Sequence, residues 1–112
     1  MSIAKYDRLG QSLTLLEWAA LLELKTYKRV AETTLPNGKW VSTVWLGLDC
    51  SFGDRPPLIF ETMVFPSKEQ LDELDIERYA TEEEAREGHT CMVEKWSKCQ
   101  ETPVVLETLG QD

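Results

Sequence analysis

Few side chains in this chain of 112 residues are suited to chemistry. His89 is the only histidine, and we predict that it projects from the apolar face of a C-terminal helix toward a sheet. A half-buried histidine beside Asp49, Cys50 or Glu61 could serve as a general base or a metal ligand near neutral pH. Cys50 could be a nucleophile if a cation or His89 lowered its pKa. The simpler interpretations are a core histidine bonded to a strand carbonyl or to Glu61, and a passive thiol beside a turn-forming aspartate.

Motifs that would identify an enzyme are missing from the sequence. It contains no GKS or GKT phosphate loop, no GxGxxG, no HExxH, no GxSxG and no EF-hand loop. An odd number of cysteines, with no signal sequence in MSIAKYDRLG, predicts reduced thiols, and their spacing fits no zinc motif. These cysteines are Cys50, Cys91 and Cys99. We therefore assign no catalytic residue, no metal and no cofactor, and prefer a non-enzymatic role.

Charge is distributed unevenly along the chain, whose net charge is −8. Residues 1–60 contain seven basic and six acidic side chains, whereas residues 61–112 contain five basic and fourteen acidic ones. This argues against direct nucleic-acid binding and favours a partner protein with a basic surface. The simpler interpretation is a solvated acidic face that keeps the protein soluble and caps a helix, because runs of charge are usually solvated surfaces. The predicted partner-binding residues are Glu82, Glu83, Glu84, Glu87 and Trp40.

Two capping boxes mark the helices that must position these residues. Thr14 and Glu17 predict a helix over about residues 15–24, whose apolar face has Leu15, Trp18, Ala19 and Leu22 at spacings of three and four. Thr81 and Glu84 predict a second helix, which ends near residue 98 or 99. The apolar face of the second helix consists of Ala85, His89, Met92, Trp96 and Cys99.

The segments between the helices predict a sheet. Strands over about residues 26–34 and 40–48 flank Asn37-Gly38, a dipeptide that tolerates the positive φ of a hairpin turn. Large apolar side chains alternate onto both faces of the second strand, which predicts a central strand covered on both sides or nearly so. Residues 58–65 predict a third strand, and residues 76–80 a fourth strand at the sheet edge; the segment between them is a loop or one helical turn.

These elements predict an α+β protein in which two helices pack on an antiparallel sheet of three to four strands, in the order α-β-β-β-(β)-α. With 42% apolar residues, the chain can form one core. We expect a single domain over residues 1–100 and a C-terminal tail over residues 101–112 that adds a strand or docks. The four tryptophans are Trp18, Trp40, Trp45 and Trp96, and we expect at least three of them to pack in the core. We expect Trp40 to be the most exposed. The alternative is that the tryptophans form a ligand platform or a partner hot spot.

Three blocks of sequence together resemble a small uncharacterised family of phage, prophage and actinobacterial proteins. The blocks are WVSTVWLGLD, GDRPPLIFETMVF and RYATEEEAREGH, and the resemblance covers about residues 12–97. It implies a single α+β domain and a phage-type accessory protein that blocks host machinery. Many relatives have His at the position of Cys50, which implies in them an Asp-His pair facing the helical histidine and suited to metal binding or proton transfer. This chain departs from that pattern.

The expected function is therefore a protein–protein interaction with a host or phage protein that has a basic surface. Such binding could inhibit a host defence system, a CRISPR system included, or a protein that handles nucleic acid. A second hypothesis is a small enzyme or metal-dependent catalyst that uses His89 with Asp49, Cys50 or Glu61. A third is a structural homodimer or assembly factor joined through an edge strand or an exposed tryptophan surface. No apolar run is long enough to span a bilayer, so we expect a cytoplasmic protein that binds neither membrane nor nucleic acid.

Overall fold

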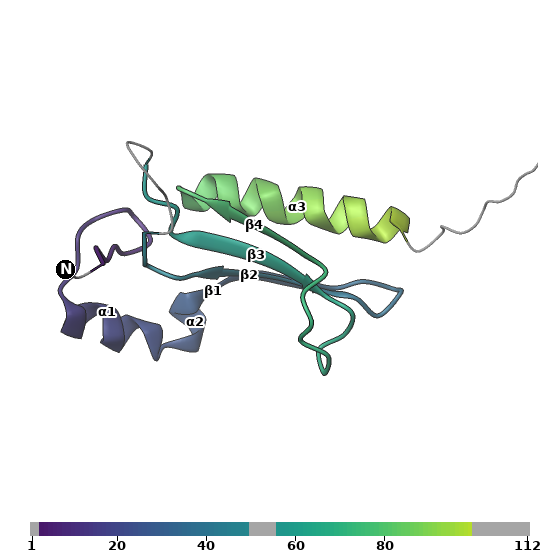
Figure 1. The fold of residues 1–112 in the computed structure, drawn as a ribbon, viewed down its shortest axis with the longest axis horizontal. Coiled ribbons are helices and arrows are strands. Elements are labelled where there is room, and N and C mark those ends of the chain that lie inside the picture. The colour runs from purple at the N-terminus through teal and green to yellow at the C-terminus, as the bar shows by residue number, and fades with distance from the viewer. Residues whose placement is uncertain (1–2, 50–55, 100–112) are drawn as a thin grey trace, which may run out of the picture.

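The computed structural model of this chain describes residues 3–49 and 56–99. Its elements are α1 (Leu15–Leu22), α2 (Lys25–Lys28), β1 (Arg29–Thr34), β2 (Trp40–Trp45), β3 (Phe60–Phe65), β4 (Asp75–Tyr79) and α3 (Glu82–Cys99). The strands form one antiparallel sheet in the order β1-β2-β3-β4. In Figure 1, α3 runs along one face of the sheet, and α1 and α2 lie on the other side near one end. The predicted α+β class is confirmed. The predicted tail over residues 101–112 lies outside the described residues.

Both predicted helix starts are present. The Thr14 hydroxyl accepts a hydrogen bond from the Glu17 N–H at 3.1 Å, and the Glu17 carboxylate accepts one from the Thr14 N–H at 2.9 Å. This capping box satisfies two N–H groups that the first turn leaves without partners. At α3 the Thr81 hydroxyl accepts from the Glu84 N–H at 3.1 Å, but the Glu84 carboxylate reaches back one residue further than predicted, to the Ala80 N–H at 3.2 Å.

The segment after α1 differs from the prediction. The expected helix over residues 15–24 stops at Leu22, and the expected strand over residues 26–34 begins only at Arg29, because Lys25–Lys28 form the short helix α2. The reason lies in the packing of Tyr27, whose ring meets the edge of Trp45 at a centroid distance of 5.0 Å and an angle of 83°. An extra turn of helix places this ring against the core, and that tertiary contact overrides the strand propensity of the segment.

The hairpin turn forms where Asn37-Gly38 predicted it. Gly38 has φ +92°, the Leu35 N–H donates to the Lys39 carbonyl at 2.8 Å, and the Asn37 side chain accepts from the Lys39 N–H. The strands are shorter than predicted: β2 ends at Trp45 instead of residue 48, and β3 begins at Phe60 instead of residue 58. Gly47, with φ +74°, takes the backbone after β2 out of the strand conformation. The N–H groups of Leu46 and Gly47 both donate to the Ile59 carbonyl, so the regular pairing of β2 with β3 stops there.

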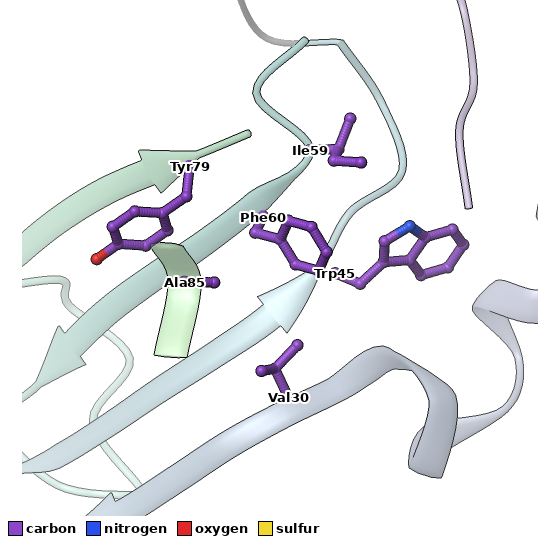
Figure 2. Packing of buried hydrophobic residues seen from close by; sticks show 6 residues of the cluster. All are labelled: Val30, Trp45, Ile59, Phe60, Tyr79 and Ala85. Carbon is purple, nitrogen blue, oxygen red and sulfur yellow. The ribbon is translucent and has the colours of Figure 1, made fainter. Parts of the chain in front are cut away.

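The apolar core lies on the face of the sheet that α3 covers, in two clusters, and side chains of α1 and α2 also pack against the first of them. The first contains Val30, Trp45, Ile59, Phe60, Tyr79 and Ala85, and Figure 2 shows Phe60 between Trp45 at one end and Tyr79 at the other. The second contains Leu35, Val41, Val64 and Met92, with Val93 and Trp96 packed against it. Trp18 packs against the first cluster, so three of the four tryptophans contact the core, as predicted.

One prediction about the sheet is confirmed in part. β2 is central, and its face with Val41, Thr43 and Trp45 lies beneath α3. On its other face Ser42 is buried, whereas Trp40 and Val44 are half-exposed. The periodicity of two correctly sorted the side chains onto two faces. It could not show that α1 and α2 would lie at one end of the sheet, where α2 packs near the beginning of β1.

The close approach at Gly47 makes a stability prediction. A Cβ atom at this position would lie 2.5 Å from a ring carbon of Trp45 and 2.8 Å from Trp18, on a backbone that already has positive φ. We expect Gly47→Ala to lower the free energy of unfolding by about 2–4 kcal/mol, since strain and overpacking add. Gly38→Ala is the matched control, because Gly38 also has positive φ but has no neighbour within 4 Å. Urea titrations that show equal losses for both variants would refute the packing argument.

Candidate functional site

His89 lies in the core beneath α3, as its position on the apolar helix face predicted. Its side chain is 7% exposed, and each ring nitrogen contacts a threonine hydroxyl. Nε2 lies 2.9 Å from Thr33 Oγ1 on β1, and Nδ1 lies 2.7 Å from Thr43 Oγ1 on β2. In the neutral ring one nitrogen donates and the other accepts, so both contacts are satisfied in either tautomer. His89 is therefore a hydrogen-bonded core histidine, bonded to hydroxyls rather than to the carbonyl or Glu61 named above.

A polar layer extends from His89 across the sheet. Thr43 Oγ1 also lies 2.5 Å from Thr62 Oγ1 on β3, so the hydrogen bonds join Thr33, His89, Thr43 and Thr62. Along β2, β3 and α3 this layer falls between the two apolar clusters. A buried hydroxyl or imidazole without a partner costs about 1–3 kcal/mol of folding free energy. This layer therefore favours the strand register and the position of α3 on the sheet in which all four side chains meet.

The structure does not bring His89 together with Glu61. Glu61 lies on the opposite face of β3 from Thr62, and its carboxylate accepts from Arg78 Nε at 3.1 Å. Asp49 follows β2, where its backbone N–H donates to the Ala4 carbonyl at 3.4 Å, and Cys50 lies outside the described residues. The catalytic arrangement of the second hypothesis thus lacks Glu61, and a buried His89 offers no ring nitrogen to a substrate in solution.

The remaining chemistry is limited within residues 3–49 and 56–99. No group of three or more His, Cys, Asp and Glu side chains in this part of the chain is placed to hold a metal ion. Cys91 is a free, exposed thiol on α3. None of the helices found there has both the length and the hydropathy to cross a membrane.

Of the glutamates predicted to bind a partner, Glu82 has a different position from the others. Its carboxylate accepts from Arg8 at 2.5 and 2.9 Å, and from Arg86 at 2.9 and 3.1 Å. The Arg8 guanidinium lowers the pKa of Glu82, and Arg86 adds to that effect. Arg8 also donates to the Tyr27 carbonyl at 2.9 Å. Glu82 thus joins α3 to the N-terminal segment, and the spacing of residues gave no sign of this pair, which is 74 positions apart.

The outward side of α3 carries glutamates without ion pairs. Glu83, Glu87 and Glu94 are exposed, lie at spacings of four and seven, and make no ion pair among the described residues. We call these three residues the acidic ridge. Two basic side chains of the same helix are already engaged, since Arg86 pairs with Glu82 and Lys95 pairs with Asp75 at 2.7 Å. Glu84 is exposed as well, but it caps the helix.

Trp40, the last predicted partner-binding residue, lies on the other side of the sheet from α3. Its ring lies 5.5 Å from that of Phe65, its indole N–H donates to Glu32 at 2.9 Å, and the Arg29 guanidinium lies 5.3 Å from its ring centroid. Trp40 and the acidic ridge therefore cannot contact the same flat partner surface. Trp40 lines a groove on the sheet face that α3 does not cover, whereas the glutamates are exposed on α3, so the predicted residues form two separate surfaces. Figure 1 shows α3 on one side of the sheet only.

Burial of His89 predicts a pH dependence of stability. Desolvation lowers the pKa of His89 from 6.5, and the charge of Arg86 lowers it further. The unfolded chain therefore binds a proton more readily at His89 than the folded chain does. The contribution of neutral His89 to the free energy of unfolding is complete above about pH 6.5 and is lost as pH falls toward the folded-state pKa. Urea unfolding of the wild type should show a lower midpoint at about pH 5.5 than at about pH 8, and His89→Gln should lose most of this difference while being less stable at both pH values. Asp75 and Glu82, with lowered pKa values, respond only in more acid solution. A histidine variant with the full wild-type pH response would contradict this account.

Comparison with known proteins gives no assignment to a family. No family model, no curated protein and no solved structure matches this chain. The function must therefore be argued from the surfaces that this fold presents. Two of them differ from an ordinary solvated surface: the acidic ridge on α3, and the half-exposed apolar face of the sheet around Trp40.

Proposed function

We propose that this protein acts without catalysis, by binding another protein through the acidic ridge of α3. The observation that carries the proposal is the pairing of charges on and around that helix. Glu82, which faces the rest of the fold, pairs with Arg8 and Arg86, and Lys95 of the helix pairs with Asp75 on β4. Glu83, Glu87 and Glu94 on the outward side make no ion pair among the described residues. Unmatched charges on a rigid helix attract a complementary surface and speed its association.

The partner that fits this ridge is a protein with a basic surface. A helix 18 residues long presents its glutamates at fixed spacing, so arginine and lysine side chains of a partner can meet several of them at once. Proteins that handle nucleic acid carry such basic surfaces. The resemblance to phage-associated proteins supports a narrower proposal: a phage-type accessory protein that inhibits a host defence system or a nucleic-acid-handling protein.

We place this activity in the cytoplasm. Cys91 is exposed and unpaired, which suits a reducing compartment. The exposed thiol would be prone to oxidation and to intermolecular disulfides in an oxidising one. The neutral, buried environment of His89 supports the non-enzymatic part of the proposal, because it leaves the histidine no accessible reactant.

The proposal predicts a loss of binding when the ridge is neutralised. In capture experiments from bacterial lysate at low salt, we expect the wild type to retain basic proteins that elute as salt rises, because salt screens exposed charges. Glu83→Gln, Glu87→Gln and Glu94→Gln combined should weaken this binding about 3- to 100-fold, since each exposed ion pair contributes roughly 0.2–1 kcal/mol. Quantitative mass spectrometry of the captured proteins, followed by titration calorimetry with the purified partner, measures the effect.

The matched control removes the same number of negative charges elsewhere. Glu69→Gln, Asp72→Gln and Glu73→Gln combined change three exposed residues in the segment between β3 and β4, so the net charge of the two triple variants is identical. The control should retain the partner. Equal loss in both variants would mean that the overall charge attracts basic proteins and that the ridge has no role. Retention by both would exclude the ridge as the binding surface.

A further inference from the structure

The face of the sheet opposite α3 has an apolar groove. We call this surface the open face: it presents Trp40, Val44, Met63 and Phe65, with Leu71 beside them, around a hollow of about 190 Å³. Leu71 is 64% exposed, although it lies against apolar side chains. The groove is lined by side chains of β2 and β3 and by Leu71, which lies between β3 and β4. Figure 1 shows that α3 runs along the other face of the sheet. An apolar surface at the centre of a sheet that is left half-exposed is typical of a binding site.

The charges around the open face differ from those on the rest of the molecule. Within the groove Glu61 is neutralised by Arg78 at 3.1 Å, and Arg29 donates to Ser42 at 2.6 Å. Beside β1, a second hollow is lined by Lys25, Thr26, Lys28, Arg29 and Glu32, three cations and one carboxylate. A protein with a net charge of −8 thus presents a locally positive rim on the β1 side of its apolar groove, whereas the segment that contains Leu71 carries the exposed acids Glu69, Asp72 and Glu73. The occupant of this groove should combine apolar side chains with carboxylates.

Helix α1 has the complementary composition. It buries none of its residues, and its Leu15, Leu16 and the following Leu24 are 62%, 80% and 52% exposed. Over residues 15–24 the only charged side chains are Glu17, whose carboxylate caps the helix, and Glu23. The inner side of α1 is fixed by Trp18, whose indole N–H donates to the Leu46 carbonyl at 3.0 Å. The outward leucines are therefore held on a helix that is anchored to the fold, and they face solvent.

We propose that a second copy of this chain covers the open face, with the outward leucines of its α1 in the groove and its Glu23 beside the positive rim. In each chain α1 and the open face lie on the same side of the sheet (Figure 1). A two-fold axis can therefore place each α1 against the groove of the other copy in one reciprocal interface, the usual arrangement of a homodimer. The contact removes two exposed apolar surfaces from water at once, and it leaves the acidic ridges on the outside of the dimer.

The first test is the solution mass of the full chain. Sedimentation velocity over a range of concentrations should show a reversible change from 12.9 kDa to twice that mass. Leu16→Glu on α1 and Leu71→Glu at the groove should each raise the dimer Kd by about tenfold or more, because a carboxylate would replace a buried apolar contact. Both leucines are exposed in the single chain, so the fold should survive; circular dichroism checks this, and Leu24→Glu provides a second α1 variant.

A mixing experiment distinguishes the reciprocal contact from other dimers. Leu9→Glu is the matched control, since Leu9 is 83% exposed but belongs neither to α1 nor to the groove, and its mass should match that of the wild type. An equimolar mixture of Leu16→Glu and Leu71→Glu chains should recover part of the dimer, because one of its two contacts is intact. Wild-type chains that stay monomeric at every concentration would overturn the proposal. A dimer that neither variant weakens would overturn it as well. The same holds if the chain dimerises only after residues 100–112 have been removed. None of these results depends on the acidic ridge.

Discussion

The structure depends on one constraint: four antiparallel strands have two faces, and this chain has one long helix to cover them. α3 lies on the face that carries Trp45, Phe60 and Val64, and the side chains between these positions necessarily point the other way. Several of those side chains are large and apolar, among them Trp40 and Phe65. The protein therefore has a buried apolar core on one side of the sheet and a half-exposed apolar surface on the other. The two sides differ in what they can bind.

The polar layer at the centre of the core makes that arrangement specific. His89 meets Thr33 and Thr43 only if α3 lies at one height along the sheet, whereas apolar contacts alone would tolerate a shift of the helix. Asn37 adds a second fixed point, since its side chain donates to the Trp96 carbonyl at 3.2 Å near the other end of α3. Arg8 and Glu82 provide the third. These contacts determine which way the glutamates of α3 face.

The distribution of charge follows from the same contacts. Carboxylates that face inward are paired with arginine or lysine, and burial without such partners would be costly. The pairs use basic side chains that would otherwise offset the outward glutamates. A negative helix surface and a locally positive sheet rim therefore occur in one small domain, and the two proposed interactions use opposite sides: a basic partner on α3 and a second copy on the open face. A dimer of this kind would present two acidic ridges, which increases avidity for a partner with repeated basic sites.

Local chemistry was sufficient to predict much of this architecture. Thr14 and Thr81 marked the helix starts, Asn37-Gly38 marked the hairpin, and alternation assigned the strand faces, because each of these signals acts over a few residues. Contacts between distant segments decided the rest. Residues 25–28 form a helix in which Tyr27 contacts Trp45, and Glu82 pairs with Arg8 instead of facing solvent. His89 bonds to two threonines rather than to Glu61, which lies on the opposite face of β3. Which side of the sheet would remain open was a property of the tertiary structure alone, since it depends on where the helices pack and not on how any one of them forms.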